Sequence, residues 1–307
     1  MTGLSPHVIR IWERRYGAVT PRRTPTNRRL YSDADIERLR LLRQAVALGH
    51  SISRIAALPD EEIMQLVTEP AHDTPRAARV GGDAAKTASG TGQQAASFFV
   101  ESAFTAIGRL DALALEEVMA RASLSLGVLP FLEEVAAPFM DSIGLAWRAG
   151  KVRVAQEHMA SALVRTFLGD ILRNVEPPEG APDLIAGTPP RQDHELGALM
   201  AAVVAASEGW RVTYLGPNVP IEEVCIAAEV RRARAVALSI VFPPDDPHLP
   251  RELRQFRKIL RRDTAILAGG ASAAAYKDVL EPIGAVTLSN LGDLPDALRG
   301  VREASSG

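Results

Sequence analysis

The side chains best suited to binding a metal lie in one short segment, Gln192-Asp193-His194-Glu195-Leu196-Gly197. This segment follows a β-rich run at residues 183–188 and begins an amphipathic stretch at residues 195–208. We therefore expect His194 at the carboxyl end of a strand, the edge at which α/β sheets bind their ligands. A neutral imidazole at that edge can ligate a metal. A lone histidine at the start of a helix is more often structural, so the assignment needs support from other motifs.

Two further motifs follow this histidine along the chain. His-x-x-Gly at positions 194–197 is followed by Ser-x-Val at positions 239–241 and then by a glycine pair at positions 269–270. The residues concerned are His194, Gly197, Ser239, Val241, Gly269 and Gly270. Their order and spacing resemble the cobalamin-binding domain of methionine synthases, mutases and corrinoid carriers, over residues 181–303.

The resemblance implies that the chain binds cobalamin (vitamin B12). His194 would replace the cofactor's own base on cobalt, and the nucleotide tail would enter the sheet beside Ser239 and the glycine pair. Two glycines leave no side chain in the path of a bulky tail, and the serine offers it a hydroxyl. The cofactor contacts implied here are Gln192, Asp193, His194, Gly197, Ser239, Val241, Gly269 and Gly270.

A tryptophan and a Glu-His pair precede this domain. Residues 98–176 carry apolar side chains at helical spacing, which predicts a four-helix bundle. Within it, Trp147 is followed after nine residues by Glu157-His158, an arrangement that resembles the cap of the CarH/LitR photoreceptor regulators, where it covers the adenosyl face. An indole, a carboxylate and an imidazole can stack on and hydrogen-bond an adenosyl group. The resemblance therefore implies adenosylcobalamin as the cofactor.

Two positions depart from the pattern of these families. Gln192 stands where corrinoid domains often place an acidic residue that hydrogen-bonds the ligating histidine; an amide can accept that bond but stabilises an imidazolium less. Arg148 stands where light-sensing relatives can hold a histidine that ligates cobalt after photolysis. These departures leave open a sensor domain that no longer binds cobalamin and responds to a protein or another ligand.

The segment from Met1 to Leu58 is strongly basic. It contains eleven arginines against four acidic residues, a net charge of +7; since the whole chain has −2, the remainder carries −9. A basic end joined to an acidic body is typical of a module that meets phosphates, tethered to one that does not.

The motifs of this basic end resemble the winged helix-turn-helix module of the MerR family. They are a capped helix at residues 4–16 with Trp12 on its packing face, a basic turn at residues 21–31 that would form a wing, and a helix at residues 32–49. The resemblance implies a double-stranded DNA operator as partner, contacted by His7, Arg10, Arg14, Arg15, Arg23, Asn27, Arg29 and Tyr31. MerR-like modules usually place a helix before the Thr2-Gly3-Leu4-Ser5 turn, so we expect the chain as it begins here to bind DNA weakly or not at all.

Composition divides the chain into four parts, and we predict a multidomain protein. An α-rich winged helix-turn-helix domain (1–70) and a flexible linker (71–97) precede a four-helix-bundle cobalamin cap (98–176) and a Rossmann-like cobalamin-binding domain (181–303). In the last part β-rich runs alternate with amphipathic stretches, which predicts an α/β doubly wound parallel sheet. The expected elements are 183–188, 195–208, 211–215, 221–232, 235–241, 249–261, 265–268, 274–283 and 285–288.

Several classes of protein are excluded by the same reading. No apolar run approaches the roughly 20 residues that cross a bilayer, and no signal-like stretch follows Met1, so we expect a cytoplasmic protein without a membrane partner. The single cysteine, Cys225, has no second thiol and is expected to be an ordinary helix residue. No nucleophile–base pair is readable from the spacing, so no catalytic centre is expected.

Together these patterns predict a cobalamin-dependent transcriptional regulator. The leading hypothesis is a repressor whose self-association, as a dimer or tetramer, is set by adenosylcobalamin and reversed by light. Self-association would strengthen operator binding because several weak heads engage DNA together. A corrinoid methyl carrier is the main alternative, since it pairs the same bundle and sheet, but the basic N-terminal module argues against it.

Overall fold

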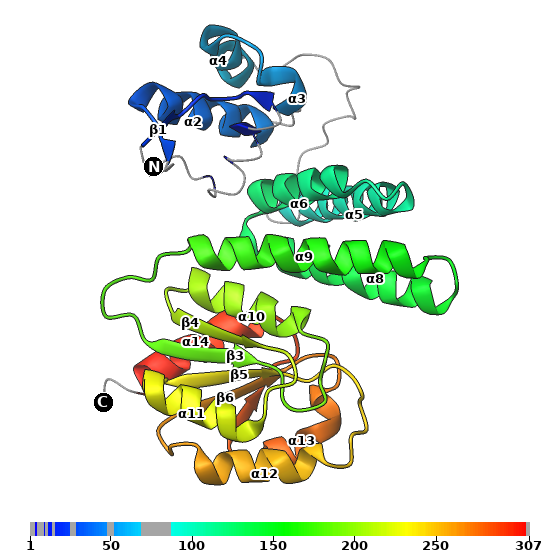
Figure 1. Cartoon of the computed structure of the whole chain (residues 1–307), viewed down its shortest axis with the longest axis vertical. Helices are drawn as coiled ribbons and strands as arrows, with labels where there is room; N and C mark the ends of the chain where they lie inside the picture. The colour runs from blue at the N-terminus through cyan, green and yellow to red at the C-terminus, as the bar shows by residue number, and fades with distance from the viewer. Residues whose placement is uncertain are drawn as a thin grey trace.

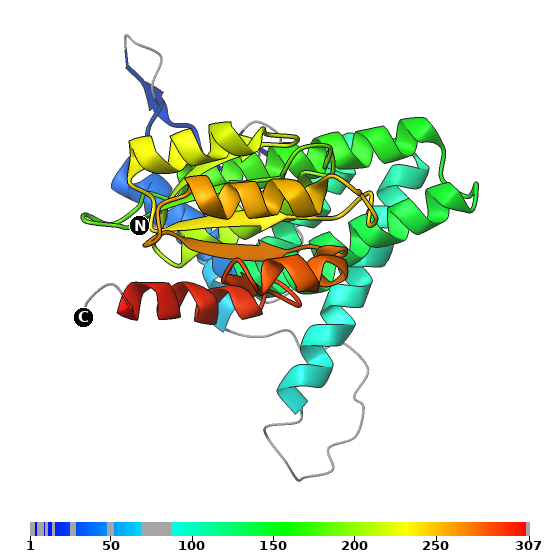
Figure 2. The ribbon, with the colours of Figure 1, turned by 90° about the horizontal axis from the view of Figure 1, so that it is seen from below.

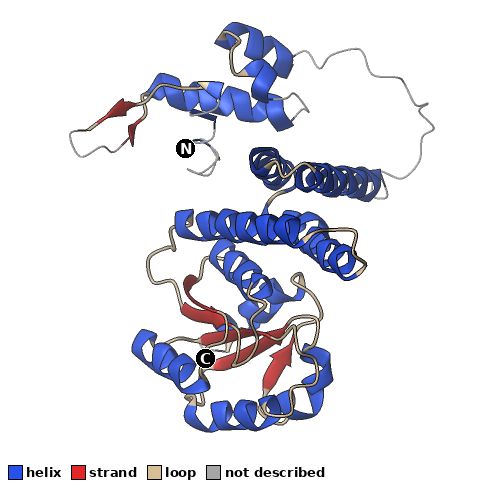
Figure 3. Cartoon of the chain, turned by 45° about the vertical axis from the view of Figure 1, so that its right-hand side comes forward, coloured by secondary structure: helices blue, strands red, loops and turns tan. Residues whose placement is uncertain are grey.

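The computed structural model describes residues 4, 9, 12–13, 16–24, 29–47, 52–68 and 87–304. In chain order they form a small N-terminal module, a set of long helices and an α/β domain (Figure 1). Among the described residues, strands occur only as a hairpin in the first part and as one sheet in the last (Figure 3).

The N-terminal module combines a short hairpin with helices. Its elements are β1 (Arg22–Arg23), β2 (Arg29–Leu30), α2 (Asp33–Ala47), α3 (Ile52–Ile55) and α4 (Asp60–Thr68). The strands are antiparallel. α2 begins at a cap in which the Ser32 amide and hydroxyl donate to the Asp35 carboxylate, at 2.8 and 2.7 Å. The core of the N-terminal module contains the buried side chains of Trp12, Leu42 and Ile63. The burial of Trp12 agrees with the prediction that it lies on the packing face of the first helix.

The middle of the chain is helical. Its elements are α5 (Thr87–Gly108), α6 (Ala112–Leu126), α7 (Val128–Phe131), η1 (Leu132–Ala136), α8 (Ala137–Arg148) and α9 (Val154–Asn174). Residues 87–97, which we expected to be linker, belong to α5; the helix extends N-terminally from the apolar stretch, and Ala96, near the end of this segment, is already buried. The rest of the expected linker lies outside the described residues. Across the described ranges, no helix is long and apolar enough to cross a membrane.

A wide turn interrupts the helix that runs from α7 into α8. η1 is a π-helical segment in which the Ala137 amide donates to the Leu132 carbonyl. Pro138 follows directly and has no amide hydrogen, so the regular hydrogen-bond ladder cannot continue through it. The wide turn also carries Glu133, which reaches the α/β domain, as shown below.

The α/β domain is built on a five-stranded parallel sheet in the order β4-β3-β5-β6-β7. Its strands are β3 (Asp183–Gly187), β4 (Arg211–Gly216), β5 (Ala235–Ser239), β6 (Ala265–Gly269) and β7 (Ala285–Thr287). All neighbouring pairs are parallel, as the strand–helix alternation predicted. The register aligns Ser239 with Gly269, so the second and third sequence motifs meet at the carboxyl edge.

Helices cover both faces of the sheet (Figures 1 and 2). α10 (Leu196–Ser207) and α14 (Asp293–Glu303) lie on the side of α9, whereas α11 (Ile221–Arg231), α12 (Leu249–Ile259) and α13 (Lys277–Leu280) lie on the other. α10 is almost wholly apolar because it is buried between α9 and the sheet. The pattern missed α14, whose buried face consists of Leu294 and Leu298 in an otherwise polar segment with an internal proline and glycine. Burial raises the pKa of Cys225 on α11 to about 11, consistent with a structural thiol.

Candidate functional site

His194 lies in the loop that joins β3 to α10, at the carboxyl edge of the sheet. Its side chain and that of Asp193 are exposed. The imidazole packs edge-to-face against the Phe242 ring, with 5.7 Å between the ring centroids and 66° between the planes. Phe242 is itself 57% exposed, so an apolar ring stands beside the histidine at the surface. The edge of the sheet therefore presents an accessible imidazole, as the sequence predicted.

Gln192 does not hold His194. Its side chain is fully buried, and its Oε1 accepts hydrogen bonds from the amides of Val241 and Phe242, both at 2.8 Å. Its Nε2 donates to the Pro243 carbonyl at 3.2 Å. An amide oxygen has two lone pairs, and both are used, so Gln192 cannot accept the bond from an imidazole that its sequence position suggested. The structural role of Gln192 is to clamp the loop after β5.

Ser239 ends β5 with a hydroxyl that has no partner. The residue is 5% exposed, and within the described part of the chain its Oγ makes no hydrogen bond. Gly197, near the start of α10, lies directly opposite: a Cβ built on it would stand 2.6 Å from this hydroxyl. A buried hydroxyl without a partner is costly, so one in a native protein indicates a missing acceptor or donor. The pairing of Gly197 with Ser239 thus marks a place where a ligand group would be received.

The two glycines at the end of β6, Gly269 and Gly270, differ in how closely the protein surrounds them. A Cβ on Gly269 would make only ordinary contact with Leu288, at 3.6 Å. A Cβ on Gly270 would stand 2.5 Å from the Ile240 carbonyl oxygen, and Gly270 has φ +99°, which side chains disfavour. The protein's own backbone therefore already requires a glycine at position 270, and the expected ligand path beside the glycine pair stays a prediction.

Hydrogen bonds and an ion pair to neighbouring loops hold the loop that carries His194. The Thr188 hydroxyl donates to the Gln192 carbonyl and accepts from the Asn218 amide at 2.8 Å. Arg191 pairs with the buried carboxylate of Asp246 at 2.7 Å. Burial works to raise the pKa of Asp246, but hydrogen bonds from the His248 amide and Arg191 outweigh it and lower the pKa. This carboxylate therefore stabilises the fold at neutral pH and loses that effect as the pH falls through its lowered pKa.

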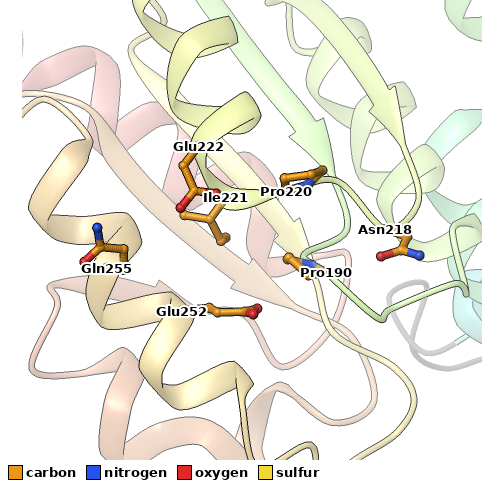
Figure 4. Close-up of a pocket in the computed structure, with 7 residues that line it drawn as sticks. All are labelled: Pro190, Asn218, Pro220, Ile221, Glu222, Glu252 and Gln255. Atoms are coloured by element: carbon orange, nitrogen blue, oxygen red, sulfur yellow. The ribbon is translucent and has the colours of Figure 1, made fainter.

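A cavity of about 220 Å³ lies beside this loop, between α11 and α12 (Figure 4). It is lined by Pro190, Asn218, Pro220, Ile221, Glu222, Glu252 and Gln255. None of the residues predicted from the sequence lines it, and Ser239 faces α10 on the other side of the sheet. The cavity is therefore separate from the candidate site.

Trp147 lies at the end of α8 and the Glu-His pair lies in the first turn of α9, on the two sides of the turn that joins these helices. Trp147 is 49% exposed and His158 is exposed, so neither belongs to the core. The Glu157 carboxylate accepts from the Ser161 hydroxyl at 2.6 Å and lies 3.8 Å from the His158 imidazole. Both views place this turn on the side of the molecule where the strands end (Figures 1 and 2). The structure therefore brings an exposed indole and polar groups to the side of the sheet that carries His194.

Two contacts join the helices to the α/β domain near the site, and the sequence did not indicate either. Glu195, next to His194, pairs with Arg165 of α9 at 3.1 Å and accepts from the Tyr214 hydroxyl of β4 at 2.8 Å. Burial and this carboxylate raise the pKa of Tyr214 well above its ordinary value, which keeps the hydroxyl a donor. At the second contact Glu133, on the wide turn, accepts from the Gly292 amide at 2.6 Å.

We expect Glu195→Ala to loosen the His194 loop. The substitution removes the carboxylate that accepts from the partly buried Tyr214 hydroxyl at 2.8 Å and leaves only the Glu195 carbonyl at 3.5 Å, which costs roughly 1–3 kcal/mol, so amide exchange in residues 188–197 should rise about tenfold. Arg165→Met is the matched control, because the Arg165 side chain is 55% exposed and an exposed pair contributes below about 1 kcal/mol. Hydrogen exchange followed by mass spectrometry would measure both variants. Equal effects would show that the loop depends on the ion pair with α9 instead.

The predicted DNA contacts are described only in part. His7, Arg10, Arg14, Arg15 and Asn27 lie outside the described residues. Arg23 is exposed on β1, and Arg29 pairs with Glu13 at 2.7 Å, a contact that raises the pKa of the guanidinium. The Tyr31 hydroxyl donates to the same carboxylate at 3.4 Å. Glu13 thus ties the hairpin to the first helix.

Arg38 is a structural residue that the sequence analysis counted only as charge. Its guanidinium donates to the carbonyls of Ala18, Ala56 and Leu58, at 2.7 to 3.0 Å, and pairs with Asp60. One side chain therefore holds the loop before β1, the end of α3 and the start of α4 against α2.

We expect Arg38→Met to destabilise the N-terminal module by about 2 kcal/mol, because it leaves partly buried carbonyls without donors. Amide exchange in α2 and α4 should rise by roughly 30-fold. Arg43→Met, at an exposed position of the same helix, should change exchange little. Similar exchange in the two variants would contradict the role of Arg38.

Comparison with known proteins agrees with these parts. Residues 1–62 match the MerR HTH family of regulatory proteins, and B12 binding domains match residues 100–169 and 182–291. Over 281 residues the chain is 32% identical to the HTH-type transcriptional repressor CarH of Myxococcus xanthus, an alignment that covers 92% of this chain and 89% of CarH. It is 27% identical to the repressor CarA of the same organism, over 100% of this chain and 96% of CarA.

A solved structure shares the fold of the second and third parts. The monomethylamine corrinoid protein of Methanosarcina barkeri aligns with a TM-score of 0.51 and 18% identity, over 64% of this chain and 95% of that protein. At this identity the likeness concerns the arrangement of helices and sheet alone.

Proposed function

Because the chain belongs to the family of MerR-type transcriptional repressors with B12-binding domains that includes CarH and CarA, we propose that it represses transcription under the control of adenosylcobalamin and light. It is a cobalamin-dependent, DNA-binding transcriptional regulator. The adenosyl form, the light response and self-association are the parts of this proposal that go beyond family membership.

The observation that carries the proposal is the unpartnered hydroxyl of Ser239, buried opposite Gly197 and on the same sheet edge as His194. A protein that binds cobalamin must contact two parts of the cofactor. One is the cobalt, which can take an imidazole as ligand, and the other is a long polar tail. The exposed His194 suits the first and the buried hydroxyl suits the second. The residues present therefore fit the group.

We assign the holding of the cofactor to the following residues. His194 would ligate cobalt, Ser239 would hydrogen-bond the tail, and Gly197 and Gly269 would leave room beside it. The exposed side chains of Leu145, Trp147 and Val154 would cover the opposite face, with Glu157 and His158 as polar contacts to an adenosyl group. When bound, adenosylcobalamin supplies a light-sensitive cobalt–carbon bond.

The finer architecture belongs to the same proposal. Residues 1–70 form a winged helix-turn-helix whose wing is the β1–β2 hairpin, and the helical segments from α5 to α9 form a four-helix cap. Residues 181–303 form the cofactor domain. In operator binding, Arg23 would meet phosphate, whereas Arg29 and Tyr31 would act through Glu13. Dimers or tetramers would raise operator affinity by engaging several modules together.

An absorption spectrum tests the proposal. Purified protein is mixed with adenosylcobalamin in the dark, separated from free cofactor, and measured before and after green light. We expect a retained cobalamin whose own base is replaced by a histidine, a spectral change on illumination, and a parallel loss of assembly and operator binding. A spectrum unchanged by light would refute the light response, and protein that retains no cobalamin would leave a MerR-type regulator with another signal.

The exposed Arg148 sharpens this test. A guanidinium stays protonated and cannot replace an imidazole as a cobalt ligand. We therefore expect the illuminated protein to keep a single histidine ligand, and a product with two nitrogen ligands would show that His158 or another histidine takes that place.

A further inference from the structure

Within the described residues, His194 has no hydrogen-bond acceptor to orient its ring. Metal-ligating histidines usually donate their second ring nitrogen to a carboxylate, carbonyl or water, which orients the ring and tunes the ligand. Asp193 is exposed and makes no bond to it, Glu195 is engaged by Arg165 and Tyr214, and the oxygen of Gln192 is saturated. No side chain of these neighbouring residues therefore sets the ring's direction by a hydrogen bond.

The contact present is the Phe242 ring. A phenylalanine that is 57% exposed gains little from burial, so its place is not explained by the core. It stands edge-to-face with His194, at 5.7 Å and 66°, which is the geometry that aromatic pairs prefer. Rotation of the imidazole about its side-chain bonds would break this contact.

The backbone beneath Phe242 is held by Gln192. The buried glutamine binds the amides of Val241 and Phe242 and the carbonyl of Pro243, three consecutive residues of one loop. Ser272 adds a fourth bond, donating to the Val241 carbonyl at 2.6 Å. The loop is thereby fixed at the point where the phenylalanine side chain leaves it.

Resting on the proposed function, we propose that Phe242 is the positioning residue of the cobalt ligand His194, and that Gln192 acts on the histidine only through the Phe242 loop. In this chain an aromatic ring takes the place of the acidic hydrogen-bond partner, and the glutamine at that sequence position serves the ring instead of the imidazole. Removing the ring leaves His194 able to reach cobalt but free to turn away.

The test compares cobalamin binding by Phe242→Ala, Phe242→Tyr, Gln192→Ala and the double variant that combines Phe242→Ala with Gln192→Ala. Binding is measured by absorbance titration with cobalamin, and ligation by the nitrogen splitting in the electron paramagnetic resonance spectrum of the Co(II) form. We expect Phe242→Ala to weaken binding about 10- to 100-fold and to reduce the nitrogen-ligated fraction, as loss of an orienting partner does. Phe242→Tyr should keep both the affinity for cobalamin and the nitrogen-ligated fraction of the parent, because it keeps the aromatic ring.

The double variant tests whether Gln192 acts on His194 through Phe242 or independently of it. If Gln192 acts only through Phe242, combining the two substitutions should weaken binding no more than the larger single effect, whereas independent action gives additive losses. Phe98→Ala is the matched control, since Phe98 lies on α5, is 56% exposed and also stands edge-to-face with a neighbour, Phe99. It should bind cobalamin as the parent does.

The outcomes separate this inference from the proposed function. A parent chain that retains no cobalamin overturns both. A parent with a nitrogen ligand and a Phe242→Ala variant with unchanged affinity and spectrum overturns only the inference, as does additivity in the double variant. Gln192→Ala removes three bonds from a buried site and can disturb folding; Phe242→Ala alters an exposed side chain, so it decides the question even if the glutamine variant unfolds.

Discussion

His194→Ala should abolish histidine ligation of cobalt and weaken cobalamin binding by more than about 100-fold, a larger loss than removal of an orienting partner produces. The reason is that His194 presents an exposed imidazole at the carboxyl edge of the sheet, and no other described residue of the β3–α10 loop is a histidine that could replace it. The absorption spectrum of any residual complex should show the cofactor's own base, or water, on cobalt. Operator binding should no longer respond to cobalamin.

His248→Ala is the matched control for this prediction. His248 is also exposed at the carboxyl side of the sheet, at the start of α12, and its backbone amide donates to Asp246. An alanine keeps that amide, so the substitution should leave both affinity and spectrum as in the parent. If His248→Ala and His194→Ala lost cobalamin equally, the assignment of the ligand to the β3–α10 loop would be wrong.

Gly270→Ala should cause the largest loss of stability in the α/β domain, about 3 kcal/mol or more, with or without cofactor. A methyl group would stand 2.5 Å from the Ile240 carbonyl oxygen at a residue with φ +99°, so steric overlap adds to backbone strain. The same turn bonds Ile240 at both polar groups, through the Gly269 carbonyl and the Ser272 amide, and cannot shift without breaking the end of β5. Thermal unfolding followed by circular dichroism would measure the loss.

Gly269→Ala provides the contrast. Its methyl group would only touch Leu288 at 3.6 Å, so we expect a change in stability below about 1 kcal/mol. If the cofactor tail passes beside Gly269, the same variant should bind cobalamin more weakly although it folds normally. A folded Gly269→Ala chain with parental cobalamin affinity would place the tail elsewhere, and a folded, stable Gly270→Ala chain would contradict the steric argument.

Pattern alone predicted the parallel sheet and the place of His194. Strand–helix alternation is a local property: each strand and helix of the sheet must carry its own period of apolar residues, so it is readable before the chain folds. The resemblance to cobalamin-binding domains implied that the Ser-x-Val motif and the glycine pair lie together, and the pairing of Ser239 with Gly269 agrees with this. The MerR and B12-binding matches confirm the identity of the parts.

Local patterns failed where tertiary contacts decide. The start of α5 lacks a clear apolar period and continues the helix that becomes buried at Ala96, whereas the whole of α14 forms because α10 packs against it. Hydrogen-bond partners far apart in sequence were equally invisible: nothing in the order of residues indicates that Gln192 saturates its oxygen on Val241 and Phe242, 49 and 50 residues away.

The sequence by itself thus determined the residue types at the site and the edge of the sheet at which they gather, because these follow from spacing and from the direction of parallel strands. Only the tertiary structure decided what each residue does there. It left the Ser239 hydroxyl without a partner among the described residues, made Gly270 a requirement of the Ile240 backbone, and set the Phe242 ring edge-to-face against His194. Those roles depend on distances of a few ångströms between segments remote in sequence, which no local pattern encodes.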